Sequence, residues 1–72
     1  MKFQVLENNK PADCHNYPVD ESWNNSVFTT KKGALAYVQL WLGHYWPKGG
    51  IEFNTPYHYS GGADTIEIRV IK

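Results

Sequence analysis

Residues 27–43, VFTTKKGALAYVQLWLG, constrain the fold of this chain more than any other segment, because they combine a helix start signal, an amphipathic pattern and a stop signal. Thr29 or Thr30 can accept the first free backbone N–H groups as an N-cap, and Gly43 can adopt the left-handed conformation that closes a helix. One face of the predicted helix is apolar, with the members Ala34, Leu35, Val38, Trp41, Leu42 and Tyr45. The sequence therefore predicts a helix that lies on a sheet.

The part of the chain before the helix contains one clear strand pattern. Residues 2–7 alternate between the two sides of an extended chain, which predicts a strand, and residues 26–28 form a short strand candidate that leads into the helix. Residues 8–25 have no sustained periodicity, so they are interpreted as a long ordered loop or as two short extended pieces. Tyr17 and Trp23 are expected to anchor this segment to the core.

The part after the helix predicts a hairpin. Residues 51–54 and 57–59 are expected to be extended, and Pro56 between them favours an edge position or a bulge. Residues 60–64, SGGAD, predict a turn, and residues 65–72 predict the clearest strand. In this strand the helix-facing side is Ile66, Ile68 and Val70, and the solvent-facing side is Glu67 and Arg69. The prediction is a single α+β domain, residues 1–72, with a small antiparallel sheet in the order β-β-α-β-β covered on one face by a single helix.

Composition limits the classes of function. Seven basic and seven acidic side chains cancel to a formal net charge of zero, so a strong phosphate-binding surface is disfavoured and nucleic acid is the less favoured partner. Cys14 is the only cysteine, which fits a reducing, cytoplasmic setting and rules out an intramolecular disulfide. No segment approaches the run of about 20 apolar residues that spans a bilayer, so no membrane partner is expected.

The sequence contains no recognisable catalytic or metal-binding motif. Cys14 and His15 are adjacent, and adjacent side chains on an extended chain point to opposite sides, so they are interpreted as a structural or solvent-exposed pair. The histidines at 15, 44 and 58 lack the spacing that identifies a metal site. We therefore expect no enzyme activity, no cofactor and no metal, and a small enzyme or metal protein built on Cys14, His15 and His58 is the third interpretation.

A second stripe on the helix is the more informative anomaly. If Val38 marks the centre of the buried face, Tyr37, Leu40 and His44 lie about 100° or more away and should be exposed, with Trp46 nearby. Exposed apolar side chains of this kind mark protein interfaces. Three explanations remain open: a partner protein, cover by the long loop, or a homodimer.

Tyr57 and Tyr59 form a second aromatic pair, on an edge-like strand with His58 on its opposite side. Such rings pack in a core and hydrogen-bond through their hydroxyl groups, or they stack on bases. A nucleic-acid or nucleotide binder that uses Tyr57, Tyr59 and Trp23 is therefore the alternative interpretation of function.

The layout of residues 27–72, in which the phrase FTTKKGALAYVQLW carries an aromatic-rich helix, resembles small phage-encoded accessory proteins. This resemblance is one of layout and carries over no functional residue. It implies a non-enzymatic inhibitor that binds a host enzyme or defence complex in the host cytoplasm, and anti-CRISPR and other anti-defence proteins share the small size and the lack of catalytic motifs. The prediction is a protein-binding inhibitor or modulator whose binding residues are Tyr37, Leu40, His44, Trp46, Tyr57 and Tyr59.

Overall fold

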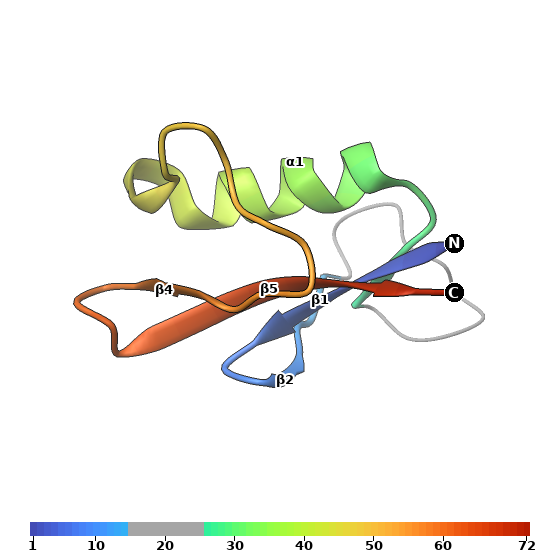
Figure 1. The fold of residues 1–72 in the computed structure, drawn as a ribbon, viewed down its shortest axis with the longest axis horizontal. Coiled ribbons are helices and arrows are strands. Elements are labelled where there is room, and N and C mark those ends of the chain that lie inside the picture. Colours follow the sequence, from blue (N-terminus) through green and yellow to red (C-terminus); the bar gives the residue numbers. More distant parts are fainter. Residues whose placement is uncertain (15–25) are drawn as a thin grey trace.

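The computed structural model describes residues 1–14 and 26–72, and within them one α-helix packs on one face of an antiparallel sheet (Figure 1). In chain order the elements are β1 (Lys2–Glu7), β2 (Lys10–Pro11), β3 (Val27–Phe28), α1 (Lys31–Leu42), the short 3-10 helix η1 (Gly43–Tyr45), β4 (Tyr57–Tyr59) and β5 (Asp64–Ile71). The strand order is β2-β1-β5-β4, and β3 also pairs with β1. The predicted α+β fold is confirmed.

The centre of the sheet is the long antiparallel pair of β1 and β5. Their register runs from Lys2 opposite Ile71 to Glu7 opposite Ile66, and it places Val5 beside Ile68, both fully buried. Alternate residues of these strands face the helix, as the period-two pattern predicts. The core under the helix consists of Phe3, Val5, Ala12, Cys14, Phe28, Ala34, Tyr37, Val38, Leu42, Ile66 and Ile68.

The side of the sheet away from the helix departs from the prediction at one position. Glu67 was expected to face solvent but is only 5% exposed, whereas Arg69 is exposed as expected. The guanidinium of Arg69 donates to both carboxylate oxygens of Glu67, at 3.2 Å from Nε and 3.3 Å from Nη2. Residues two apart on a strand share a face, so this ion pair supplies the partner that a buried carboxylate requires.

Both helix caps lie where the sequence predicts them. The Oγ1 atom of Thr30 accepts a hydrogen bond from the N–H of Gly33 at 3.0 Å, and Gly43 ends the helix with a φ of 56°. A Cβ atom at Gly33 would come within 3.0 Å of that Oγ1 and within 3.3 Å of the Phe28 ring. Because Gly33 has no side chain, the Thr30 cap and the Phe28 ring can both lie close to the backbone at the start of α1.

The segment expected to be extended at residues 51–54 contributes no strand to the sheet, and residues 53–54 lie in a turn. Asn54, with a φ of 61°, is the residue of this segment that forms hydrogen bonds with β5. Its N–H donates to the carbonyl of Ile68, and its Oδ1 accepts from the N–H of Val70, both at 2.8 Å. One residue in the left-handed region thus satisfies two backbone groups at the edge of β5, which a strand would otherwise do.

The other expected segments have mixed outcomes. The strands predicted at residues 2–7, 26–28, 57–59 and 65–72 are present to within one or two residues, and the chain turns between β4 and β5 as expected. Part of the predicted loop forms the short strand β2, whereas Tyr17 and Trp23 lie outside the described residues. After η1 the chain rises over the flank of α1 and returns to the edge of the sheet at β4 (Figure 1).

Candidate protein-binding surface

The buried arc of α1 is rotated relative to the prediction. Tyr37, expected to be exposed, is buried at 6% exposure, whereas Trp41 and Tyr45, expected in the core, are 49% and 42% exposed. The buried members of the helix are Ala34, Tyr37, Val38 and Leu42. At 100° per residue this arc is centred near Ala34, between Tyr37 and Val38, and not on Val38. The small side chain of Ala34 permits the close approach of the helix that brings Tyr37 inside.

Tyr37 and Trp41 are neighbours on the helix with opposite surroundings. Their rings stack with centroids 6.2 Å apart and planes 16° apart, and Tyr37 also packs against Phe28 with centroids 5.8 Å apart. The indole Nε1 of Trp41 donates to the hydroxyl of Tyr59 at 3.3 Å. Trp41 is therefore held at two points while half of its side chain remains in solvent.

The chain turn at Gly43 brings further rings beside Trp41. In η1 the ring of Tyr45 lies 4.2 Å from that of His44 and 5.7 Å from that of Tyr59 (centroid distances). The Tyr57 hydroxyl donates to the carbonyl of Tyr45 at 3.1 Å. Together with exposed neighbours on the helix, these residues form what we refer to as the aromatic surface: Leu40, Trp41, His44, Tyr45, Tyr57 and Tyr59.

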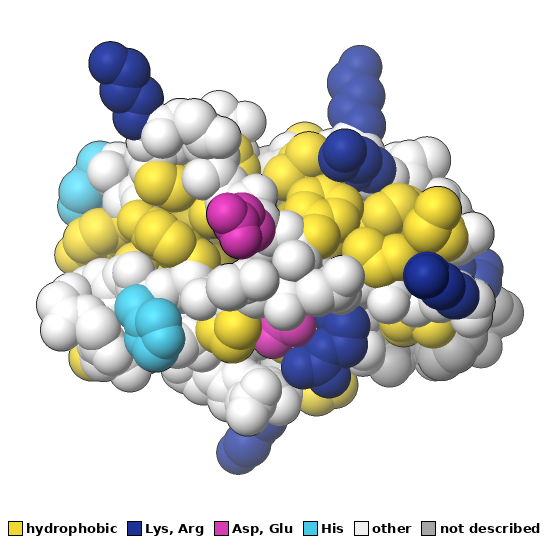
Figure 2. Space-filling view, viewed as in Figure 1, with side chains coloured by type: hydrophobic (Ala, Val, Ile, Leu, Met, Phe, Trp, Pro, Cys, Tyr) yellow, Lys and Arg dark blue, Asp and Glu magenta, His cyan; other side chains and the backbone are white. Residues whose placement is uncertain are grey.

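The aromatic surface lies at one end of the molecule. Figure 2 shows hydrophobic side chains gathered there, between the two histidine side chains. Leu40 is 69% exposed and His44 is also exposed, as predicted, whereas Tyr57 and Tyr59 are half-buried because they face the helix. His58 points to the opposite side of β4 and is exposed. No Lys, Arg, Asp or Glu belongs to this set.

Of the six predicted binding residues, the structure brings three together around Tyr45, namely His44, Tyr57 and Tyr59, and Leu40 is exposed one turn before His44. Tyr37 lies beneath them in the core, and Trp46 is half-buried in a separate groove. The prediction missed Trp41 and Tyr45. The available signal was their place at the last turn of the helix and just after the Gly43 cap, where less of the sheet lies beneath a side chain.

Cys14 has a structural role. The thiol is 1% exposed and donates to the carbonyl of Ala12 at 3.9 Å. Burial raises the pKa of the Cys14 thiol to about 11, and a hydrogen bond with Tyr37 offsets part of that effect. A thiol with this pKa is protonated at neutral pH and is a poor nucleophile. His15 lies outside the described residues.

Among residues 1–14 and 26–72, no group of three or more His, Cys, Asp and Glu side chains is placed to hold a metal ion. Within the same residues, no helix has both the length and the apolar character needed to cross a bilayer. Comparison of the chain with models of protein families, with curated protein sequences and with solved structures gives no match.

Proposed function

We propose that this protein is a non-enzymatic binding protein that docks on a larger protein through the aromatic surface and thereby covers part of that partner. The observation that carries the proposal is the exposure of Leu40, Trp41 and Tyr45, at 69%, 49% and 42%, near the C-terminal end of α1. Scattered exposed apolar residues are ordinary, but adjacent ones with large aromatic members are typical of interaction sites.

The chemistry of these side chains suits an interface centre. Trp and Tyr are the residues most enriched among those that dominate binding energy at protein interfaces. Trp41 is already oriented by Tyr37 and by its hydrogen bond to Tyr59. Because a pre-ordered ring loses little conformational entropy on binding, most of its buried area contributes to affinity.

The same contacts define what the partner must offer. An apolar pocket is needed for Leu40 and the exposed edge of Trp41. The Tyr59 hydroxyl accepts from Trp41, so its own hydrogen remains available for an acceptor on the partner. A partner with an apolar depression rimmed by carbonyl or carboxylate oxygens fits these requirements.

An inhibitory role follows from the resemblance in layout to phage-encoded accessory proteins. A chain of 72 residues has no room for a deep active site beside its core, so its effect on a larger partner would come from covering a surface. We propose a host enzyme or defence complex in the host cytoplasm as the partner class. Stacking on bases is the weaker alternative, because Tyr57 and Tyr59 are half-buried and their hydroxyls are engaged with the helix side.

Affinity capture with matched variants tests the proposal. Immobilised wild-type protein, Leu40→Glu and His58→Glu are each incubated with nuclease-treated lysate of the native host cell, and retained proteins are quantified by mass spectrometry. Leu40 lies on the aromatic surface, whereas His58 is exposed on the other side of β4, so both variants add one carboxylate at an exposed site. We expect a protein retained by wild type and His58→Glu to be lost from Leu40→Glu, because a buried unpaired charge is costly.

Three results would contradict the proposal. Equal retention by Leu40→Glu would place the interface elsewhere. Retention from untreated lysate that is absent from nuclease-treated lysate, or retention that falls steeply with salt, would favour the nucleic-acid alternative. Sedimentation of the purified wild type as a dimer that Leu40→Glu converts to a monomer would assign the surface to self-association.

A further inference from the structure

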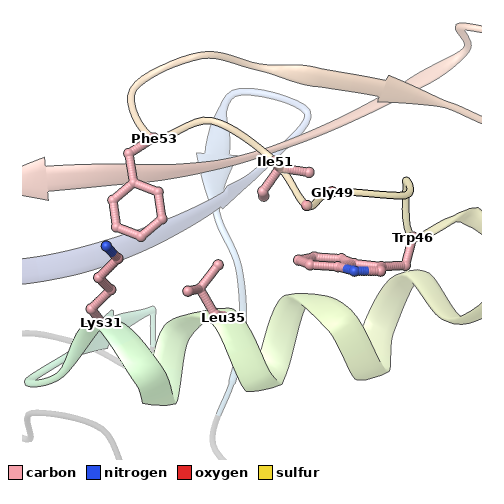
Figure 3. Close-up of a pocket in the computed structure, with 7 residues that line it drawn as sticks. Lys31, Leu35, Trp46, Gly49, Ile51 and Phe53 are labelled. Carbon is pink, nitrogen blue, oxygen red and sulfur yellow. The ribbon is translucent and has the colours of Figure 1, made fainter.

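A second candidate site lies on another part of the molecule, between the N-terminal half of α1 and the segment that follows η1 (Figure 3). This groove has a volume of about 550 Å³ and is lined by Lys31, Leu35, Trp46, Ile51, Phe53 and the backbone of Gly49 and Gly50. The volume is within the range typical of sites for small molecules. None of the lining residues belongs to the aromatic surface, so the groove is independent of the proposed function.

The walls of the groove are fixed by local backbone and ring contacts. The N–H of Gly50 donates to the carbonyl of Pro47 at 3.0 Å, and Gly49 and Gly50 have φ values of 95° and 86°, which turn the chain back toward the helix. This turn sets Ile51 across from Leu35 in Figure 3. The opposite end is closed by Phe53, which packs edge-to-face on Phe3 with centroids 5.9 Å apart.

The polar side-chain groups that line the groove, on Lys31 and Trp46, are donors. The Lys31 ammonium lies 5.3 Å from the centre of the Phe53 ring and forms no ion pair with any described residue. The Trp46 Nε1 likewise has no hydrogen-bond acceptor within the described part of the chain. No Asp or Glu lines the groove, and the neighbouring Glu52 is exposed outside it.

We infer that this groove binds a small-molecule carboxylate that carries an aromatic ring or a short apolar chain. The carboxylate pairs with the Lys31 ammonium, in a charge-assisted hydrogen bond. The apolar body lies along Leu35 and Ile51 and against the Trp46 ring, where flat aromatic groups stack favourably. A single lining ammonium matches one negative charge, whereas polyphosphates call for several cations or a glycine-rich cradle at a helix start.

Proton–nitrogen correlation NMR with two matched probes tests this inference. The probes are 3-phenylpropionate and its uncharged analogue 3-phenylpropionamide, each titrated to millimolar concentration. We expect the carboxylate to shift the backbone signals of Leu35, Gly50, Ile51 and Phe53, and the one indole N–H signal that Trp46→Phe removes. The amide should bind about tenfold more weakly, because it lacks the charge-assisted bond to Lys31.

Lys31→Met and Lys48→Met complete the test. Lys31→Met keeps an unbranched apolar side chain in the groove, and we expect it to lower the affinity for the carboxylate to that for the amide. Lys48 lies in the loop that contains Gly49 and Gly50 but does not line the groove, so Lys48→Met should bind both probes like wild type. The spectra themselves report whether each variant is folded. Equal affinity of wild type for the two probes, shifts centred on other residues, no shifts at all, or an unchanged preference in folded Lys31→Met would each overturn the inference.

Discussion

Two regions of the same helix make opposite use of aromatic residues. Tyr37, which packs on Phe28 of β3, is 6% exposed, and Trp41, one turn later, is 49% exposed although the two rings stack on each other. Both residues fall on the arc of α1 that faces the sheet. The difference lies in what is beneath them: Tyr37 meets Phe28 and Cys14, whereas Trp41 reaches the hydroxyl of the edge-strand residue Tyr59.

This contrast shows that helix periodicity alone does not decide burial near the end of a helix. Periodicity gives the direction of a side chain, but burial also needs strands of sufficient extent below it. β4 has three residues, so the surface that it offers to the C-terminal end of α1 is small. Variants in the buried region around Tyr37 should therefore lose more stability than variants on the aromatic surface around Trp41.

The largest effect is expected from Tyr37→Ala. Removing a buried aromatic side chain leaves a cavity and costs about 3–5 kcal/mol, which is much of the stability available to a small domain. Urea denaturation followed by circular dichroism measures this loss. Tyr37→Phe is the control, because it keeps the ring and removes only the hydroxyl that bonds with Cys14, at a cost of about 1 kcal/mol. A near-wild-type denaturation midpoint for Tyr37→Ala would show that Tyr37 does not belong to the buried face of α1.

Cys14, beside Tyr37, makes the stability of this region depend on alkaline pH. The folded thiol has a pKa of about 11 against 9.0 for an unburied thiol, so between these values the unfolded state binds fewer protons. The contribution of Cys14 to the free energy of unfolding is therefore constant below about pH 9 and falls as pH rises from 9 toward 11.

The measurement compares wild type with Cys14→Ala. Lysine and tyrosine side chains titrate in the same range, so the useful quantity is the difference in unfolding free energy between the two proteins, determined by urea denaturation at several pH values. We expect this difference to move in favour of Cys14→Ala as pH rises. A difference that does not vary with pH would mean that the thiol is accessible to water.

The smallest effect on stability is expected from Trp41→Ala. Half of the side chain is already in solvent, so its truncation loses the stacking on Tyr37 and one hydrogen bond, at a cost of about 1 kcal/mol. Thermal and urea denaturation should show a cooperative transition close to that of wild type. A loss of unfolding free energy as large as that of Tyr37→Ala would show that Trp41 belongs to the core.

Sequence patterns predicted most of the frame of this fold. The Thr30 and Gly43 caps, β1, β5 and the turn before β5 follow from local signals, and the structure contains each of them. These features depend on nearest neighbours or on simple alternation, which a sequence displays directly.

The remaining features depend on contacts between distant parts of the chain. Glu67 is buried because Arg69, on the same face of β5, pairs with its carboxylate. Asn54 forms hydrogen bonds with the backbone of Ile68 and Val70 because it lies beside β5 in a left-handed conformation. Tyr37 is buried and Trp41 is half-exposed, the reverse of the prediction. Predicting this correctly requires knowing how far the sheet extends beneath the helix. The candidate surface could thus be located near the end of the helix, but not which rings it exposes.

The most direct test of the account is the affinity of Trp41→Ala for the partner captured by wild-type protein, measured by isothermal titration calorimetry beside its unfolding free energy. We predict a loss of at least about 2 kcal/mol in binding, the range of a dominant interface residue, with only about 1 kcal/mol lost in stability. Wild-type affinity in a folded Trp41→Ala protein would contradict the assignment of the aromatic surface as the binding site.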